Sequence, residues 1–229
     1  MNQITTEIIR IKGKSYKDVW DLQLKYLNEI IDAKKEGREI SNKILFVEHN
    51  PVFTLGKSGN DNNLLVNEEF LKKKGIELFH IERGGDITFH GPGQWVVYPI
   101  FDLENFNIGL RQYIDNLEQV IINTCSEYNI KSERMEGLTG VWIENKEAMP
   151  HLKKIAAIGV MSKRYVTIHG FALNVNTDLS YFDLINPCGI TDKGITSIST
   201  IAKEDISMQE VQNKIIKHIE KIFYCSMLA

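Results

Sequence analysis

The sequence predicts an α+β protein, a mixed β-sheet with flanking helices. Short apolar runs rich in β-branched and aromatic residues are interspersed with longer segments of helical periodicity. The strand-like runs are not each followed by a helix, as the regular β-α-β units of a doubly wound sheet would require. The chain has 229 residues, 43% of them hydrophobic, and is therefore long enough to bury a core without disulfides.

Four segments show the apolar spacing of helices, and three of them have a recognisable end. Ser15 precedes the first as an N-cap residue. Gly75 follows the second after a run of lysines, as is typical of a helix C-terminus. Ser207 to Glu210 form a capping box at the start of the last. The predicted helices span residues 16–35, 68–74, 110–128 and about 208–224.

Eight runs of strand-forming residues predict the sheet. The first two are separated by Asn50-Pro51, a dipeptide typical of turns. The chain shows no internal repeat and no low-complexity linker, so we expect a single domain over residues 1–229. The predicted strands span residues 44–47, 52–55, 76–81, 87–90, 95–101, 138–143, 154–161 and 165–175.

The overall charge argues against a nucleic-acid partner. The formal net charge at pH 7 is −3, so the chain lacks the basic field that nucleic acid attracts. No apolar run approaches the roughly 20 residues that a membrane-spanning helix needs. The charged stretch from Met1 to Lys12 does not resemble a signal peptide. We therefore expect a cytoplasmic protein.

The three cysteines show no paired spacing, which indicates a reducing compartment. Cys125 falls on the inward stripe of a predicted helix, and Cys225 is expected on the terminal helix, so both are expected to be inert. Cys188 lies between Pro187 and Gly189, on a turn that would expose its sulfur. Cys188 is therefore the candidate nucleophile, although a lone cysteine is more often structural.

The densest signal for a binding site is the glycine-rich stretch from Arg83 to Gln94. Its four glycines allow the backbone to approach a ligand closely, and Thr88 and His90 could present polar groups beside it. The stretch lacks the spacing of a phosphate-binding loop or a dinucleotide fingerprint. The alternative is a strand-turn-strand corner whose glycines serve only the backbone.

Lys154 opens a run of small and apolar residues that is otherwise typical of a buried strand. Burial would lower its pKa, because desolvation disfavours the charged form, and a neutral lysine can accept a proton from a thiol. The alternative is a strand-end lysine that extends its ammonium group to water. His169, in the segment His169 to Asn174, is open to either a functional or a structural role.

Taken together, four segments resemble the lipoyl(octanoyl) transferase family, the octanoyl-[acyl-carrier-protein]:protein N-octanoyltransferases. They are similar to an early block, an Arg-Gly-Gly-x-x-Thr-aromatic-His-Gly-Pro-Gly-Gln signature, a lysine strand, and a run that ends at the nucleophile. Several long motifs in order are far more specific than one short pattern, and these lie within residues of about 40–190. The four segments are Glu48 to Gly56, Arg83 to Gln94, Lys154 to Gly159 and His169 to Cys188.

The resemblance implies a single catalytic domain with a biotin/lipoate protein ligase-like fold, also described as class II aminoacyl-tRNA/biotin synthetase-like. It implies a catalytic dyad in which Cys188 is the nucleophile and Lys154 its acid/base partner. It also implies a substrate-binding pocket lined by Arg83, Gly84, Gly85, Asp86, Ile87, Thr88, Phe89, His90, Ala157, Ile158, Gly159, Gly170, Phe171 and Ala172.

The implied reaction moves an octanoyl group from octanoyl-acyl carrier protein to the target lysine of lipoyl domains, the first step of endogenous protein lipoylation. The implied acceptors are the lipoyl domains of 2-oxoacid dehydrogenases and the glycine cleavage H protein. Lys154 would take the Cys188 proton, and the thiolate would form an acyl-enzyme. The acyl group arrives activated, so no ATP is expected. No metal is expected either, because the six histidines show no metal-ligand spacing.

Three alternatives share parts of this pattern. An ATP-dependent lipoate–protein ligase on the same fold would need no cysteine nucleophile. An octanoyl amidotransferase would take the acyl group from one lipoyl-type carrier domain to another. A non-catalytic module would bind acylated carrier domains without a covalent intermediate. The presence of both Lys154 and Cys188 in matching context favours the transferase.

Overall fold

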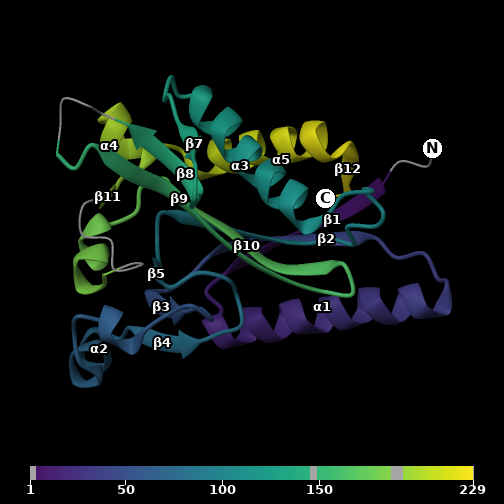
Figure 1. Cartoon of the computed structure of the whole chain (residues 1–229), viewed down its shortest axis with the longest axis horizontal. Helices are drawn as coiled ribbons and strands as arrows, with labels where there is room; N and C mark the ends of the chain where they lie inside the picture. The colour runs from purple at the N-terminus through teal and green to yellow at the C-terminus, as the bar shows by residue number, and fades with distance from the viewer. Residues whose placement is uncertain (1–3, 145–148, 187–192, 229) are drawn as a thin grey trace.

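The computed structural model describes residues 4–144, 149–186 and 193–228, and it confirms the expected α+β fold. A large mixed sheet lies at the centre of the molecule, between helices on both faces (Figure 1). A small sheet lies beside the N-terminal end of the long helix α1 (Figure 1).

The strands of the large sheet follow the order β12-β1-β2-β6-β10-β9-β8-β7, with β11 paired to β9. β1 pairs in parallel with β2 and β12, whereas the path from β2 to β7 is antiparallel throughout. These strands are β1 (Ile4–Lys12), β2 (Asn42–Glu48), β6 (Gln94–Ile100), β7 (Glu133–Met135), β8 (Leu138–Glu144), β9 (Leu152–Lys163), β10 (Val166–Asn174), β11 (Gly194–Ile195) and β12 (Cys225–Leu228).

The small sheet has the order β4-β3-β5 and carries the glycine-rich stretch at one end. β3 (Val52–Leu55) and β5 (Ile87–His90) have the bounds that the sequence predicts, and β4 (Glu77–His80) lies within its predicted run. The helix α2 (Glu68–Lys74) also has its predicted bounds, and Gly75 ends it in the left-handed conformation. These elements enclose a separate apolar core around Phe53 and Phe89.

The helices cover the large sheet from both sides. α1 (Tyr16–Glu36) packs on one face, where its buried residues meet Leu45, Tyr98 and Ile168 of the sheet. α3 (Leu110–Ser126) and α5 (Met208–Phe223) pack on the other face (Figure 1). Ser15 and Ser207 cap α1 and α5 as predicted. The short α4 (Ile198–Ala202) and two 3-10 turns, η1 (Asp61–Asn63) and η2 (Leu179–Leu184), lie in the connections.

The two ends of the chain differ from the sequence prediction. Residues 4–12 form a strand that was not expected. The placement of Cys225 on a terminal helix is wrong, because α5 ends at Phe223 and Cys225 begins β12. The cause is Tyr224, whose φ of 51° is left-handed and stops the helix. The chain then pairs with the first strand, with Cys225 opposite Ile4.

Within the described ranges, no helix is both long and apolar enough to span a membrane.

Gly170 in β10 permits the close approach of β10 to its paired strand β6. A side-chain carbon there would overlap the backbone oxygen of Val97 and lie 2.8 Å from Pro99 Cδ. We expect Gly170→Ala to lower the free energy of unfolding by about 3 kcal/mol, because neither neighbour can move freely. Gly109→Ala is the control, with no atom within 4 Å, and should cost less than about 1 kcal/mol. Urea unfolding measures both, and an equal cost would contradict this packing.

Candidate active site

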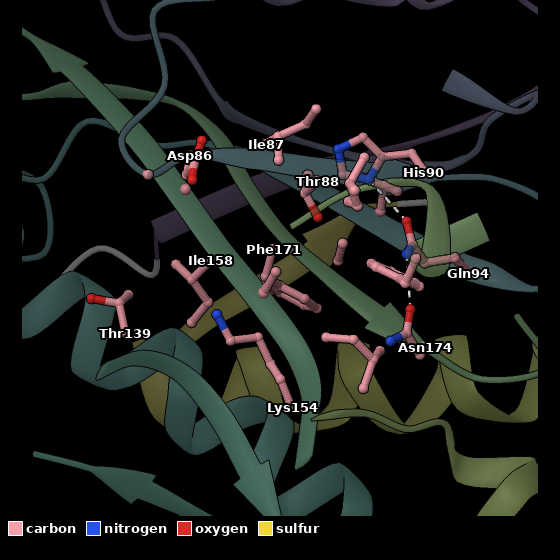
Figure 2. A pocket seen from close by; sticks show the side chains of 18 of the residues that line it. Asp86, Ile87, Thr88, His90, Gln94, Thr139, Lys154, Ile158, Phe171 and Asn174 are labelled. Carbon is pink, nitrogen blue, oxygen red and sulfur yellow. Dashed lines mark hydrogen bonds between the residues drawn. The ribbon is translucent and has the colours of Figure 1, made fainter. Parts of the chain in front are cut away.

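A cavity of about 1010 Å³ lies where the glycine-rich stretch meets the large sheet. Its walls come from β5, β6, β8, β9 and β10, with Tyr16 from the start of α1. Figure 2 shows Thr88 and His90 on one side and Lys154 and Ile158 on the other. The cavity therefore brings together segments that are separated in the sequence.

The pocket residues expected from the sequence line this cavity, with two exceptions. Gly84 does not, because it lies in the turn that packs against β9, where its N–H donates to Val160 O at 3.1 Å. Phe89 does not either. It is 1% exposed and packs into the core of the small sheet, where its ring stacks on Tyr181 at 4.4 Å between centroids.

Gly159 explains why the glycine-rich turn can lie so close to β9. A side-chain carbon on Gly159 would come within 2.8 Å of Gly84 O and 2.9 Å of Arg83 Cδ. Only a glycine leaves room for the turn to pack directly on the strand. This contact fixes Arg83 and the residues that follow it relative to β9.

The Arg83 guanidinium is buried and held by the small sheet. Its Nη2 donates to Thr54 O at 2.6 Å and to Thr54 Oγ1 at 2.9 Å, and its Nη1 donates to Gly84 O at 3.0 Å. A charge held this rigidly in a poorly solvated place acts strongly on its neighbours. It is one reason that the nearby histidines resist protonation.

A chain of side-chain hydrogen bonds links three residues along one side of the cavity, His90, Gln94 and Asn174 (Figure 2). Gln94 Nε2 donates to Asn174 Oδ1 at 2.8 Å, and Asn174 Nδ2 donates to Thr196 O at 3.0 Å. This orientation leaves Gln94 Oε1, 2.8 Å from His90 Nδ1, as an acceptor. His90 therefore carries its proton on Nδ1.

Three buried histidines and two tyrosines form a polar cluster deep in the site. Tyr98 OH lies 2.8 Å from His49 Nε2, and the ring of Tyr16 stacks parallel to that of His90. Burial lowers the pKa of His90 to about 4, and burial with the Arg83 charge lowers that of His169 to about 3. Burial also holds the pKa of His49 well below its usual value. These imidazoles are therefore neutral at pH 7.

His169 is the most unusual member of this cluster. It is 2% exposed and lines the cavity, yet neither ring nitrogen has a hydrogen-bond partner within the described part of the chain. Its φ of 61° is left-handed, which is uncommon for a residue other than glycine and often marks a functional position. Gln23 of α1 accepts a hydrogen bond from its N–H at 2.9 Å and holds the backbone in place.

Lys154 lies in β9 at the opposite end of the cavity. It is half-buried, less so than the sequence predicted, whereas the next two residues of β9 are fully buried. Figure 2 shows its side chain extending toward Ile158 and Phe171. Its Nζ lies 4.6 Å from the centroid of the Trp142 ring.

Cys188 lies outside the described residues, so its predicted pairing with Lys154 stays a prediction. The nearest described residues on either side, Asn186 and Lys193, both line the cavity that contains Lys154. Leu64 and Ile185 form a β-bridge, and Asn186 N–H donates to Asn63 O at 2.7 Å. Asn186 is therefore held in a fixed position beside the cavity.

The other two cysteines are buried away from this site. Burial raises the pKa of Cys125 to about 12 and that of Cys225 to about 11. At pH 7 both therefore remain thiols, which are poor nucleophiles. The described residues also hold no group of three or more His, Cys, Asp or Glu side chains that could bind a metal ion.

Several cavity residues were not identified from the sequence. Tyr16, Tyr98 and Trp142 occupy a helix start and two ordinary strands, where no motif distinguishes them. Gln94 ends the glycine-rich stretch identified from the sequence, but its link to Asn174 depends on the β6–β10 pairing. Only the sheet register shows that these side chains share one cavity.

The sequence is similar to known proteins over most of its length. A family model described as the lipoyl protein ligase A/B catalytic domain matches residues 15–220. An octanoyltransferase of Parabacteroides distasonis is 55% identical over 81% of this chain and 83% of its own. An octanoyltransferase of Christiangramia forsetii is 48% identical over 96% of this chain and 97% of its own.

Solved structures share the fold at low sequence identity. A bipartite lipoate protein ligase from Thermoplasma acidophilum matches with a TM-score of 0.69 and 14% identity, over 100% of this chain and 88% of its own. A biotin protein ligase from Aquifex aeolicus matches with a TM-score of 0.52 and 14% identity, over 96% of this chain and 70% of its own. These likenesses confirm the predicted biotin/lipoate protein ligase-like fold.

The buried histidines make stability depend on pH. The pKa of His169 falls from the ordinary 6.5 to about 3 on folding, so below pH 6.5 the unfolded chain binds a proton that the native site does not. Stability is therefore lost as pH falls. The test is His169→Asn, which keeps a polar residue that tolerates a left-handed φ. Between pH 7 and pH 5 we expect its free energy of unfolding to fall by roughly 2 kcal/mol less than that of the wild type. Urea unfolding at both pH values measures this, and equal losses would contradict it.

Proposed function

The chain belongs to the lipoyl protein ligase A/B catalytic-domain family and is an octanoyltransferase, and on this premise we propose that it transfers the octanoyl group through Cys188 and Lys154. Lipoyl domains are its acceptors as a class. The proposed donor is octanoyl-acyl carrier protein. The observation that carries the proposal is the position of Lys154, in a large cavity also lined by Asn186 and Lys193, which flank the segment with Cys188.

In the first half-reaction, Lys154 takes the proton of the Cys188 thiol. The thiolate attacks the carbonyl carbon of the donor thioester, and the carbon–sulfur bond to the carrier breaks. The departing carrier thiolate receives the proton from the Lys154 ammonium group. The octanoyl group is then held as a thioester on Cys188, and Lys154 is neutral again.

In the second half-reaction, the amine of the target lysine attacks this new thioester. Lys154 takes a proton from the attacking nitrogen, an amide bond forms, and Cys188 leaves as a thiolate. The amide is more stable than the thioester, so this step draws the transfer forward. The acyl group arrives activated, so the proposal includes neither ATP nor a metal. Cysteine remains a thiol in a reducing compartment, so we place the reaction in the cytoplasm.

The cavity supplies an apolar path for the acyl chain. Ile158 and Phe171 are partners in the β9–β10 pair, so their side chains lie next to each other on one face of the sheet, and both line the cavity. His169 pairs with Val160, six residues along β9 from Lys154, which is about 20 Å at the usual rise per residue. An acyl chain with its carbonyl near Lys154 therefore runs along β9, with its methyl end toward Thr88 and the buried histidines.

The ligase, the amidotransferase and the non-catalytic module differ in how the protein would acquire an acyl group, and one experiment separates them. A ligase would acylate a lipoyl domain only with ATP and free octanoate. A binding module would show no covalent intermediate. An amidotransferase would acquire its acyl group from an octanoylated lipoyl domain and not from the acyl carrier protein. The fold does not separate these activities, because the ligases share it.

We expect purified protein incubated with octanoyl-acyl carrier protein, without ATP, to gain the mass of one octanoyl group. Cys188→Ser should gain none, because an alcohol is a far weaker nucleophile than a thiolate. Lys154→Met should be acylated at least about 100-fold more slowly, the lower range for loss of an acid/base group. Intact-mass spectrometry measures all three. Acylation of Cys188→Ser, or of the wild type only with ATP and octanoate, would contradict the proposal.

We expect a larger side chain at Thr88 to shorten the preferred acyl chain. Each methylene that leaves the cavity loses about 0.8 kcal/mol, so excluding two lowers the octanoyl-to-butanoyl rate ratio by at least about tenfold. Thr88→Phe is the test, and Thr88→Val, which keeps the shape of threonine, is the matched control. The measurement is the acylation rate with each carrier-bound chain. An unchanged ratio in Thr88→Phe would place the acyl chain elsewhere in the cavity.

A further inference from the structure

The indole ring of Trp142 lies against the side-chain nitrogen of Lys154. Lys154 Nζ is 4.6 Å from the ring centroid, within the range of a cation–π contact. Trp142 is 3% exposed and lines the same cavity as Lys154. The indole side of this contact is therefore shielded from water, which would weaken the attraction.

An irregularity in the sheet produces this contact. Val141 pairs with Ala156, but the next residue of β8, Trp142, pairs with Lys154, so the β8–β9 register shifts between the two pairs. Residues directly opposite each other in an antiparallel pair have neighbouring side chains. The shift therefore places the indole ring and the lysine side chain beside each other.

The shifted register is anchored from outside the strand. Glu118 of α3 is 5% exposed, accepts a hydrogen bond from Gly140 N–H at 3.0 Å, and pairs with Arg134 Nε at 3.0 Å. Gly140 has a φ of 118°, and a side-chain carbon there would lie 2.6 Å from Ala156 O. Trp142 Nε1 donates to Leu138 O at 3.2 Å and fixes the ring.

We propose that Trp142 is a positioning residue for Lys154, which holds the ammonium group by a cation–π contact while Cys188 is a thiolate. This inference rests on the proposed function, because it needs Lys154 to accept and return the Cys188 proton. The face of an indole ring is electron-rich and attracts a cation but has no comparable attraction for a neutral amine. The contact therefore stabilises the thiolate–ammonium state over the thiol–amine state.

The chemistry of the ring gives a graded test. Fluorine withdraws electron density from the face of an indole with little change in its shape. The background is Trp20→Phe with Trp95→Phe, since both tryptophans lie outside the cavity lining, so that Trp142 is the one tryptophan left in the chain. Mono-, di- and trifluorinated tryptophan are then incorporated at position 142, and single-turnover acylation by octanoyl-acyl carrier protein is measured.

We expect the acylation rate constant at saturating donor to fall stepwise with each added fluorine. A cation–π contact changes an equilibrium by about threefold to thirtyfold, so we expect the rate constant to fall by that factor in total across the series. The donor concentration at half-saturation should not change. A flat series overturns the inference, and so does a series in which only the half-saturation concentration changes, because the ring would then bind the substrate and not the lysine.

Single substitutions in the natural background serve if the double-phenylalanine background does not fold. Trp142→Phe keeps an aromatic face, which attracts a cation less strongly than indole does, and should lose less of the rate than Trp142→Leu, which should lose about threefold to thirtyfold. With Lys154→Met already in place, Trp142→Leu should have no further effect. Equal rates for the phenylalanine and leucine variants overturn the inference. An absence of wild-type acylation would instead contradict the proposed function itself, so the two failures are distinguishable.

Discussion

The antiparallel register of β9 with β10 and β8 is the constraint on which the site depends. It pairs Ile158 with Phe171 as opposing cavity residues and Trp142 with Lys154 at the cavity's other end. A slip of one residue would turn each of these side chains to the opposite face of the sheet. On its other side β10 pairs closely with β6, and Gly170 permits this because a side chain there would overlap the backbone oxygen of Val97.

The register also separates two kinds of chemistry within one cavity. At one end, Lys154 supplies a group that can gain and lose a proton, as the proposed reaction requires. At the other end, burial and the Arg83 charge lower the pKa of His90 and His169, so neither imidazole takes up the proton at pH 7. The wall between them is apolar and suits an acyl chain. This division suits the proposed octanoyl transfer, and the fold that carries the cavity is shared with lipoate and biotin protein ligases.

Much of the fold could be predicted from local sequence. The first helix was predicted because an apolar stripe and a capping serine agree, and β3 and β5 because their residues favour strands. Residues 4–12 were missed because Glu7 and Arg10 interrupt the apolar pattern. Such a strand is fixed by its partners β2 and β12, which local sequence does not show. Cys225 was misplaced because the helical spacing continues until Tyr224 takes a left-handed φ.

The site was predictable where motifs mark it and not where the register makes it. The glycine-rich stretch and the β9 and β10 segments were identified, but Phe89 lies within a motif and faces the core, whereas Trp142 lies in no motif and faces Lys154.

In the proposed reaction, Lys154 and Cys188 share one proton. The direct measurement is the pH dependence of Cys188 alkylation by iodoacetamide in the wild type and in Lys154→Met. We expect the variant to need a higher pH for the same reactivity, and identical profiles would contradict the shared proton.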